Sequence, residues 1–338
     1  MKAIVIPGVG GAWEVREVPT PVPGPGEVLV RVRASGVCAN DVLAAKGILP
    51  FPSTDPAIPG HEPVGEIVET GPGVTGRSIG DLVGTTWIRG TCGECDYCAQ
   101  EAPLSARAAF LCAAPVSTGF TVPGGQAEYL VLRAEETVRI PAGVTAEDAV
   151  PILCAGYTAL SALRAAQARP HERVAVLGVG ALGHLALQYS RAAGHDTVAI
   201  TSSPDKRDIA THLGAGTVVA DGSALLAAGG ADVVLATAPS YTAAADAMAG
   251  LRPGGRLVLA GIDTTGPFVL PPQLPFFGLG QQIVGATHAG TPVLEDALAQ
   301  VAAGAVRPLV EVFEPDQIAD AVAKVEKGEV RFRAVVRY

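Results

Sequence analysis

The pattern of hydrophobic and polar residues divides the chain into two parts. In residues 1–140, short runs alternate in polarity or are rich in β-branched residues, and Gly and Pro separate them; these runs are KAIVI, EVLVRVRA, VGEIVET and AEYLVLRA. From about residue 144, alanine-rich helical stretches alternate with runs of Val and Ile. The first pattern predicts a β-rich domain, and the second predicts a parallel sheet with helices between its strands.

The second part centres on residues 173–191. Residues 174–177 form an apolar run without polar alternation, which indicates a buried strand, and helical spacing of apolar residues follows from 182 to 189. Between them lies a G-x-G-x-x-G turn, so the order strand, turn, helix predicts a dinucleotide site at the N-terminus of the helix. The alternative is a tight turn without a ligand. The turn residues assigned to cofactor binding are Gly178, Val179, Gly180, Ala181, Leu182 and Gly183.

Further strands are expected at 197–201, 217–220, 232–237, 256–261 and 282–287, with helices at 205–213 and 242–251 among them. Right-handed crossovers between six such strands make a doubly wound parallel sheet of the Rossmann type. A helix at 291–303 and a last strand at the end of the chain follow.

Length and charge narrow the class of protein. The 338 residues suggest two domains, and the net charge of -9 argues against binding to nucleic acid or to an anionic membrane. No apolar run is long enough to span a membrane, and Pro and Gly interrupt the N-terminus too early for a signal peptide. We therefore expect a soluble, cytoplasmic protein that acts on a small molecule.

The six cysteines could form three disulfides, but their spacing favours metal. Cys92, Cys95 and Cys98 lie within seven residues of each other, so three thiolates could wrap one tetrahedral zinc ion, and Cys112 is the nearest candidate for the fourth ligand. The alternative is a chance cluster of buried cysteines. A reducing cytosol and a large core also favour zinc over disulfides.

Three further residues that could bind a metal lie far apart in the sequence, each in a loop-like segment. They are Cys38 in SGVCAND, His61 in IPGHEPVG and Cys154 in PILCAGYT. Two thiolates and an imidazole would leave one position of a zinc ion open, as in a catalytic site. Taken one at a time, each residue is more often an ordinary core cysteine or a hydrogen-bonded histidine, and spacing alone does not bring the three together.

Several motifs in order give the chain a resemblance to the zinc-dependent medium-chain alcohol dehydrogenases over its whole length. They include SGVC-x-x-D, PGHE, CGECDYC, LCAGYTALSAL and VAVLGVGALGHLALQY. The resemblance implies an α/β fold with a GroES-like β-rich catalytic domain, residues 1–146 and 291–338, and a Rossmann cofactor domain, residues 147–290. It implies hydride transfer between an alcohol and a nicotinamide cofactor, with zinc as the Lewis acid.

The resemblance also implies roles for single residues. Cys38, His61 and Cys154 would hold the catalytic zinc, Glu62 would be a transient ligand, and Asp41 would orient His61. Trp87 would narrow the substrate pocket, unless it is simply packed in the core. The further residues implied to bind the cofactor are Thr158, Gly261, Ile262 and Arg333, with Arg331 as a rival for the role of Arg333.

The sequence departs from the family pattern in two informative places. Asn40 stands where a Ser or Thr hydroxyl usually begins a proton relay, and Leu43 replaces a histidine. We therefore expect Asn40 to position the substrate oxygen and the proton to leave through water, unless Asn40 only caps a turn. Thirteen residues separate Cys98 from Cys112, more than in the family pattern, so the cysteine lobe carries an insertion.

The residues that end and follow the second strand of the expected Rossmann sheet, 197–201, bear on the choice between NAD(H) and NADP(H). NAD sites of this fold usually have an acidic residue there, whereas this chain has Thr201, Ser202 and Ser203, followed by Lys206 and Arg207. Hydroxyls and cations suit a 2′-phosphate, which favours NADP(H) over NAD(H). The alternative is a helix start at Ser203 followed by solvated charges.

The sequence thus predicts a zinc-dependent alcohol dehydrogenase or aldehyde reductase, present as a homodimer or homotetramer. The expected metal content is one catalytic and one structural zinc. The same site could serve a carbonyl reductase or a polyol or sugar dehydrogenase. A non-catalytic nucleotide-binding protein is the alternative outside the enzymes, although all three catalytic ligands are present.

Overall fold

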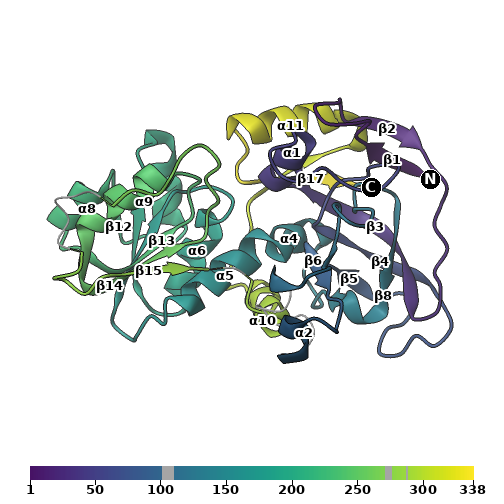
Figure 1. Cartoon of the computed structure of the whole chain (residues 1–338). Helices are drawn as coiled ribbons and strands as arrows, with labels where there is room; N and C mark the ends of the chain where they lie inside the picture. Colours follow the sequence, from purple (N-terminus) through teal and green to yellow (C-terminus); the bar gives the residue numbers. More distant parts are fainter. Residues whose placement is uncertain (101–109, 271–275, 287) are drawn as a thin grey trace. The chain divides into compact units, whose positions relative to one another are not determined.

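A computed structural model of the whole chain describes residues 1–100, 110–270, 276–286 and 288–338 (Figure 1). The chain forms two compact units. Unit 1 contains Met1–Cys154, Ala289–Ala302 and Leu309–Tyr338; unit 2 contains Ala155–His288 and Ala303–Pro308.

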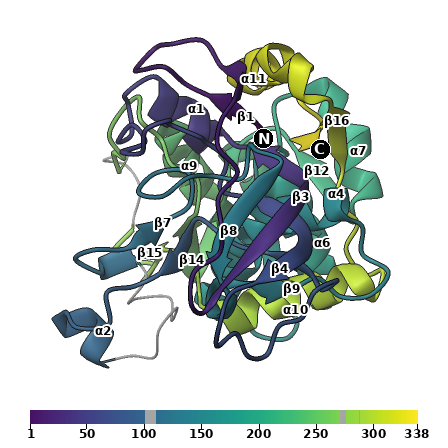
Figure 2. The ribbon, with the colours of Figure 1, turned by 90° about the vertical axis from the view of Figure 1, so that its right-hand side faces the viewer.

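Unit 1 is built on the long strand β3 (Glu27–Val37), which pairs antiparallel with β4 (Pro63–Thr70), β8 (Tyr129–Arg133) and β17 (Arg333–Arg337). The strands β3, β4 and β8 lie side by side in Figure 2. The seven-stranded sheet continues with strands β5 (Leu82–Gly84), β9 (Val138–Arg139) and β16 (Val310–Phe313). Its two-stranded companions are β1 (Lys2–Val5) with β2 (Glu14–Glu17), and β6 (Ile88–Gly90) with β7 (Val116–Ser117).

The expected β-rich character of the first part is confirmed, because each run of alternating polarity contains most or all of its residues in a strand. Val28, Val30 and Val32 of β3 point to one side and pack in the core with Ile67 and Leu130. The helical elements of unit 1 are α1 (Ala39–Ala45), α2 (Asp96–Gln100), η1 (Ala134–Glu136), α4 (Ala146–Ala149), η2 (Val150–Leu153), α10 (Thr291–Ala302), η5 (Pro315–Gln317) and α11 (Ile318–Lys327).

Unit 2 contains a six-stranded parallel sheet in the order β12-β11-β10-β13-β14-β15, which confirms the Rossmann prediction. Its strands are β10 (Arg173–Leu177), β11 (Asp196–Ile200), β12 (Thr217–Val219), β13 (Ala231–Ala236), β14 (Leu251–Leu259) and β15 (Gln282–Gly285). Its helical elements are α5 (Ala155–Ala165), α6 (Gly183–Ala192), η3 (Pro204–Lys206), α7 (Arg207–His212), α8 (Gly222–Ala227), α9 (Tyr241–Ala247) and η4 (Met248–Gly250). The chain order reverses between β10 and β13, and ligands of such sheets bind beyond the carboxyl ends of the strands at that point.

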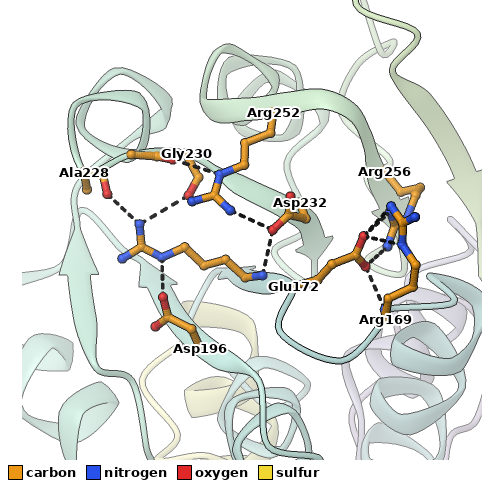
Figure 3. Close-up of polar contacts among 10 residues, drawn as sticks. Arg169, Glu172, Asp196, Ala228, Gly230, Asp232, Arg252 and Arg256 are labelled. Atoms are coloured by element: carbon orange, nitrogen blue, oxygen red, sulfur yellow. Dashed lines mark hydrogen bonds and ion pairs between the residues drawn. The ribbon is translucent and has the colours of Figure 1, made fainter.

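At the amino ends of the strands, opposite to the carboxyl ends where ligands bind, ion pairs connect neighbouring strands of this sheet (Figure 3). Arg173, at the start of β10, pairs with Asp196 at the start of β11 (Nε to Oδ2, 2.9 Å), and its backbone N–H donates to Asp232 of β13. Arg252 of β14 also pairs with Asp232 (2.8 Å). These contacts connect the starts of four neighbouring strands.

A second group at the same edge surrounds Glu172. Arg256 of β14 forms a double contact with both Glu172 oxygens, and Arg169 donates to Oε1 at 2.9 Å. Arg256 also donates to the carbonyl of Ala166 at the end of α5. The hydrogen bonds from Arg256 and Arg169 lower the pKa of Glu172 to about 2, against the opposing effect of burial. We call both groups together the ion-pair network.

No helix in the described ranges of the chain is both long and apolar enough to cross a membrane.

Candidate active site and cofactor site

Four potential metal ligands meet in the interior of unit 1. Cys38 follows β3 and precedes α1, His61 and Glu62 precede β4, and Cys154 follows η2. One ligand atom from each residue lies within 4.8 Å of the others, and all four side chains are buried. We call these residues the Cys38 cluster. The structure therefore brings together the three residues that the sequence left apart.

The imidazole of His61 is held in one orientation. Its Nδ1 lies 2.8 Å from Oδ1 of the buried Asp41, and Oδ2 of Asp41 accepts a hydrogen bond from the backbone N–H of Cys38 at 3.0 Å. The carboxylate favours a proton on Nδ1, which directs the lone pair of a neutral imidazole to Nε2. This Nε2 is buried and makes no hydrogen bond in the described ranges, and Oε1 of Glu62 lies 3.6 Å from it. Such an orphaned nitrogen beside two thiols fits a metal ligand.

The two thiols of the Cys38 cluster differ in acidity. The hydrogen bond from Cys154, aided by the charge of Arg333, lowers the pKa of Cys38 well below its usual range, although burial acts in the opposite direction. The same interaction and burial raise the pKa of Cys154. The cluster thus favours a thiolate at Cys38, and thiolates are the form in which cysteine binds zinc.

Glu62 is paired with Arg333 from β17, an ion pair that the sequence motifs did not predict. A guanidinium nitrogen of Arg333 lies 3.0 Å from Oε1, and both residues are buried. Burial raises the pKa of Glu62 to about 7, although Arg333 acts to lower it. Gly36 makes room for this side chain, because a Cβ there would lie 2.1 Å from Oε2. Arg333, expected beside the cofactor phosphates, thus lies within unit 1 next to the Cys38 cluster.

A second cluster contains only cysteines. Cys92, Cys95, Cys98 and Cys112 each place a sulfur within 4.8 Å of the others, and all are free thiols. Sulfur atoms of Cys95 and Cys98 are 3.4 Å apart, and those of Cys92 and Cys98 are 3.8 Å apart. Backbone N–H groups, led by that of Ala113, lower the pKa of Cys95 to about 6. Four converging thiols fit a closed tetrahedral zinc site. The insertion expected after Cys98 lies largely in 101–109, outside the described residues.

In unit 2, the local geometry at Gly178, Gly180 and Gly183 explains why glycine occupies each of these positions in the turn. Gly178 has φ +90°, a left-handed conformation, and a Cβ at Gly183 would lie 1.8 Å from the carbonyl oxygen of Gly178. Both positions therefore require glycine. A Cβ at Gly180 would meet nothing within 4 Å, so this position leaves open space above the N-terminus of α6. That space fits the close approach of a pyrophosphate. Val179 is buried, and Ala181 and Leu182 lead into α6.

A pocket of about 370 Å³ lies at the carboxyl ends of β14 and β15 in unit 2. Gly261 and Ile262, which the resemblance implied, line it together with residues that the sequence did not single out. The full lining is Tyr241, Leu259, Ala260, Gly261, Ile262, Gly285 and Ala286.

Thr158 on α5 has a partner that the sequence analysis missed. Its Oγ1 lies 3.0 Å from Nε2 of His288, whose ring stacks on that of Tyr157 at a centroid distance of 4.1 Å. His288 follows β15 closely, so these contacts attach the segment that ends the pocket wall to α5. An isolated histidine between Thr and Ala gave no signal in the sequence.

The residues expected to bind the 2′-phosphate of NADP(H) follow β11. Thr201 is buried, Ser202 is exposed, and Ser203 begins η3 without a capping hydrogen bond from its side chain. Lys206 ends η3, and Arg207 donates to the carbonyl of Val218. All these residues lie at the carboxyl end of the sheet, on the same side as the glycine turn.

The two remaining predicted site residues belong to unit 1. Trp87 lies just before β6, with its ring centroid 5.5 Å from that of His61. Asn40 is half-buried on the first turn of α1, two residues after Cys38.

Fold and clusters together define a two-domain oxidoreductase with a dinucleotide-binding unit and a zinc-type ligand set. Two family models match the chain. The alcohol dehydrogenase GroES-like domain matches residues 24–142, and the zinc-binding dehydrogenase domain matches residues 181–303. The chain belongs to the zinc-type medium-chain dehydrogenase/reductase family. This confirms the resemblance seen in the motifs and the expected function as an alcohol dehydrogenase.

Relatives and solved structures agree over the full length. The chain is 39% identical to an alcohol dehydrogenase from Geobacillus stearothermophilus over 349 residues, which cover 100% of this chain and 99% of the relative. A cinnamyl alcohol dehydrogenase from Sorghum bicolor has a TM-score of 0.88 at 28% identity, covering 99% of this chain and 97% of that one. A cobalt- and zinc-bound alcohol dehydrogenase from Pyrobaculum aerophilum has a TM-score of 0.86 at 28% identity, covering 100% and 99%.

Proposed function

We propose that this protein is a zinc-dependent alcohol dehydrogenase that transfers hydride between an alcohol or carbonyl substrate and a nicotinamide cofactor. The observation that carries the proposal is the Cys38 cluster, in which two thiols and an unpartnered imidazole nitrogen converge in a buried site. Zinc at this site would supply the Lewis acidity that makes an alcohol oxygen easier to deprotonate and a carbonyl easier to reduce.

The protein's own residues have distinct tasks in this proposal. Cys38, His61 and Cys154 hold the metal, and Asp41 keeps His61 in the binding tautomer. Glu62 is the candidate for a transient ligand, and Arg333 balances its charge inside the protein. Asn40 positions the substrate oxygen through its amide. Because neither Asn40 nor Leu43 can take up and pass on the proton of the alcohol at neutral pH, this proton leaves through water.

In unit 2, the glycine turn binds the pyrophosphate and the pocket at the ends of β14 and β15 receives the nicotinamide. The open space at Gly180 and the lining by Gly261 and Ile262 support these assignments. Thr158 contacts the same ring.

A panel of alcohols, aldehydes and ketones tests the proposed reaction. Purified enzyme is assayed with each compound and with both nicotinamide cofactors, and the absorbance of the reduced cofactor is followed. We expect turnover that disappears after chelation and returns with zinc. Polyols and sugars in the panel separate the related dehydrogenases. Absence of turnover with every compound would instead favour the non-catalytic nucleotide-binding alternative.

We further propose that the four-cysteine cluster holds a structural zinc. Elemental analysis is expected to give about two zinc ions per chain, one for each cluster, and Cys112→Ser is expected to reduce this to about one and to lower the thermal midpoint. An unchanged zinc content and midpoint in this variant would exclude Cys112 as a ligand.

For the cofactor we propose a preference for NADP(H). The hydroxyls of Thr201, Ser202 and Ser203 and the cation of Lys206 support it, as does the absence of a capping hydrogen bond from Ser203. A charge-assisted hydrogen bond contributes about 1.5–3 kcal/mol, so Lys206→Ala is expected to lower kcat/KM for NADPH roughly tenfold to a hundredfold. NADH kinetics are expected to change little. Lys327→Ala on the surface of unit 1 is the matched control. Equal or better efficiency with NADH in the parent enzyme would overturn the assignment.

We also propose that the enzyme is a cytoplasmic homodimer or homotetramer. β15 is the outer strand of its sheet, Ile283 on it is exposed, and Phe277, five residues before the strand, is 92% exposed. An edge strand flanked by exposed apolar side chains suits a contact between copies of the chain. The free thiols support a reducing compartment.

A further inference from the structure

His288 is a buried polar residue to which neither the sequence motifs nor the proposed reaction assigns a task. It is the last residue of the Ala155–His288 segment of unit 2, and it is 6% exposed. Two residues before it, Ala286 lines the pocket at the carboxyl ends of β14 and β15. A histidine buried at this point is expected to have polar partners, because burial of an unpaired imidazole is costly.

Two contacts with the beginning of α5 hold the imidazole of His288. Its Nε2 lies 3.0 Å from Oγ1 of Thr158, and its ring is nearly parallel to that of Tyr157, at a centroid distance of 4.1 Å and an angle of 20°. The stacking fixes the plane of the ring, and the hydrogen bond fixes its rotation within that plane. His288 therefore ties the segment that follows the pocket wall to α5.

The hydroxyl of Thr158 is the group that this contact orients. Thr158 is half-buried, whereas Tyr157 and Ala159 beside it are buried, so its side chain lies on a partly open side of α5. A helical threonine often donates to a carbonyl of the preceding turn, but in the described part of the chain the Thr158 hydroxyl bonds to His288. A hydroxyl has one donor and two acceptor positions, so the bond to His288 leaves its oxygen able to contact a ligand.

We propose that His288 is a positioning residue for the nicotinamide half of the cofactor and acts through the hydroxyl of Thr158. The inference rests on the proposed function, which assigns Thr158 and the pocket at the ends of β14 and β15 to the nicotinamide. One side chain then organises two parts of this site, because His288 orients the Thr158 hydroxyl and ties the segment after Ala286 to α5. Binding of the adenosine half does not depend on His288, since residues 201–206 are proposed to hold that half.

Binding of the cofactor and of its adenosine fragment tests the proposal without turnover. Isothermal titration calorimetry of the purified enzyme gives Kd for NADPH and for 2′,5′-ADP, or for NADH and ADP if the parent enzyme binds NADH more tightly. His288→Phe keeps a ring for stacking on Tyr157 but removes the nitrogen, and loss of one hydrogen bond corresponds to roughly a threefold to tenfold change in Kd. We therefore expect Kd for the whole cofactor to rise by that factor and Kd for the fragment to stay unchanged.

A conservative variant and a matched control separate the hydrogen bond from packing. His288→Gln places an amide close to the position of Nε2 and is expected to restore the Kd of the parent enzyme for the whole cofactor. His212→Phe makes the same substitution as His288→Phe at an exposed histidine of α7 in unit 2, and it is expected to change neither Kd.

A double variant tests whether His288 acts through Thr158. Thr158→Val keeps the shape of the side chain but removes the hydroxyl, so it is expected to raise Kd for the whole cofactor and to leave Kd for the fragment unchanged. When His288→Phe is added to Thr158→Val, we expect little further increase, because two residues that act as one unit have non-additive effects.

Several results would contradict the role of His288. They are an unchanged Kd for the whole cofactor in His288→Phe or Thr158→Val, equal losses for cofactor and fragment, no rescue by His288→Gln, and additive effects in the double variant. If the parent enzyme binds the cofactor in a manner that depends on His288 but turns over no alcohol or carbonyl compound, the proposed reaction fails and the positioning role stands. If it turns over alcohols but binds the cofactor independently of His288, the reaction stands and the positioning role is wrong.

Discussion

Replacement of His61 by alanine is expected to reduce kcat/KM by at least roughly a thousandfold. The proposed metal contributes several kcal/mol of charge stabilisation, and each 1.36 kcal/mol corresponds to about a tenfold change in rate. His61 supplies the only nitrogen of the Cys38 cluster, and its Nε2 makes no hydrogen bond in the described ranges, with Oε1 of Glu62 3.6 Å away. Metal affinity and activity should therefore fall together in this variant.

A milder variant distinguishes loss of the metal from loss of the fold. Asp41→Asn keeps the size of the side chain but removes the charge that orients His61 at 2.8 Å, and changes of this kind typically cost about 10–100-fold. Asp320→Asn on the exposed surface of α11 is the control. Activity and zinc content are measured on each protein after its circular dichroism spectrum is compared with that of the parent. Full activity and full zinc content in both His61→Ala and Asp41→Asn would exclude the site.

The second large effect is on stability. Arg256→Met is expected to lower the free energy of unfolding by about 3–5 kcal/mol, because it leaves Glu172 charged and without its strongest partner in a site where both side chains are about nine-tenths buried. Glu172→Gln, which removes the charge of the other member of the pair, is expected to lower the free energy of unfolding less. An exposed pair provides the contrast: Arg337 and Glu314 are each 54% exposed, so Glu314→Gln should lower the free energy of unfolding far less than Arg256→Met.

The contribution of Glu172 has a defined dependence on pH. Its pKa is about 2 in the folded protein, below the value of about 4.3 for an unfolded chain, so the unfolded state takes up the proton first as pH falls. The stabilisation is complete above about pH 5 and decreases as the pH falls toward 2. Urea unfolding of the parent and Glu172→Gln should therefore differ at pH 7 and converge in acid. A difference that stays constant over this range would contradict the role of the charge.

The sequence predicted the parts of the fold that short-range patterns determine. The turn from Gly178 to Gly183 was visible because a strand and a helix flank it. The strand β14 begins at Leu251, earlier than expected at 256, and Pro253, Gly254 and Gly255 lie within an irregular start of the strand. Similarly, the expected helix at 205–213 divides into η3 and α7.

Contacts between distant segments gave no such signal. Glu62 and Arg333 come from opposite ends of the chain, and nothing in either segment indicates a partner. Phe110 and Phe120 follow no period, so their meeting with Trp87 depends on how the lobe folds back. The motif residues Cys38, His61 and Cys154 could be named in advance only because the family pattern supplied the grouping that spacing lacks.

The position of the ion-pair network has a consequence for how this enzyme could change. β10 starts at Arg173 and leads to the glycine turn, and β11 starts at Asp196 and leads to Thr201, so each strand is anchored at one end and reaches the proposed cofactor site at the other. Substitutions among residues 201–206 leave the anchors untouched. The loop proposed to bind the 2′ end of the cofactor can therefore be varied, by selection or by design, while the ion-pair network at the amino ends of the strands keeps the unit folded.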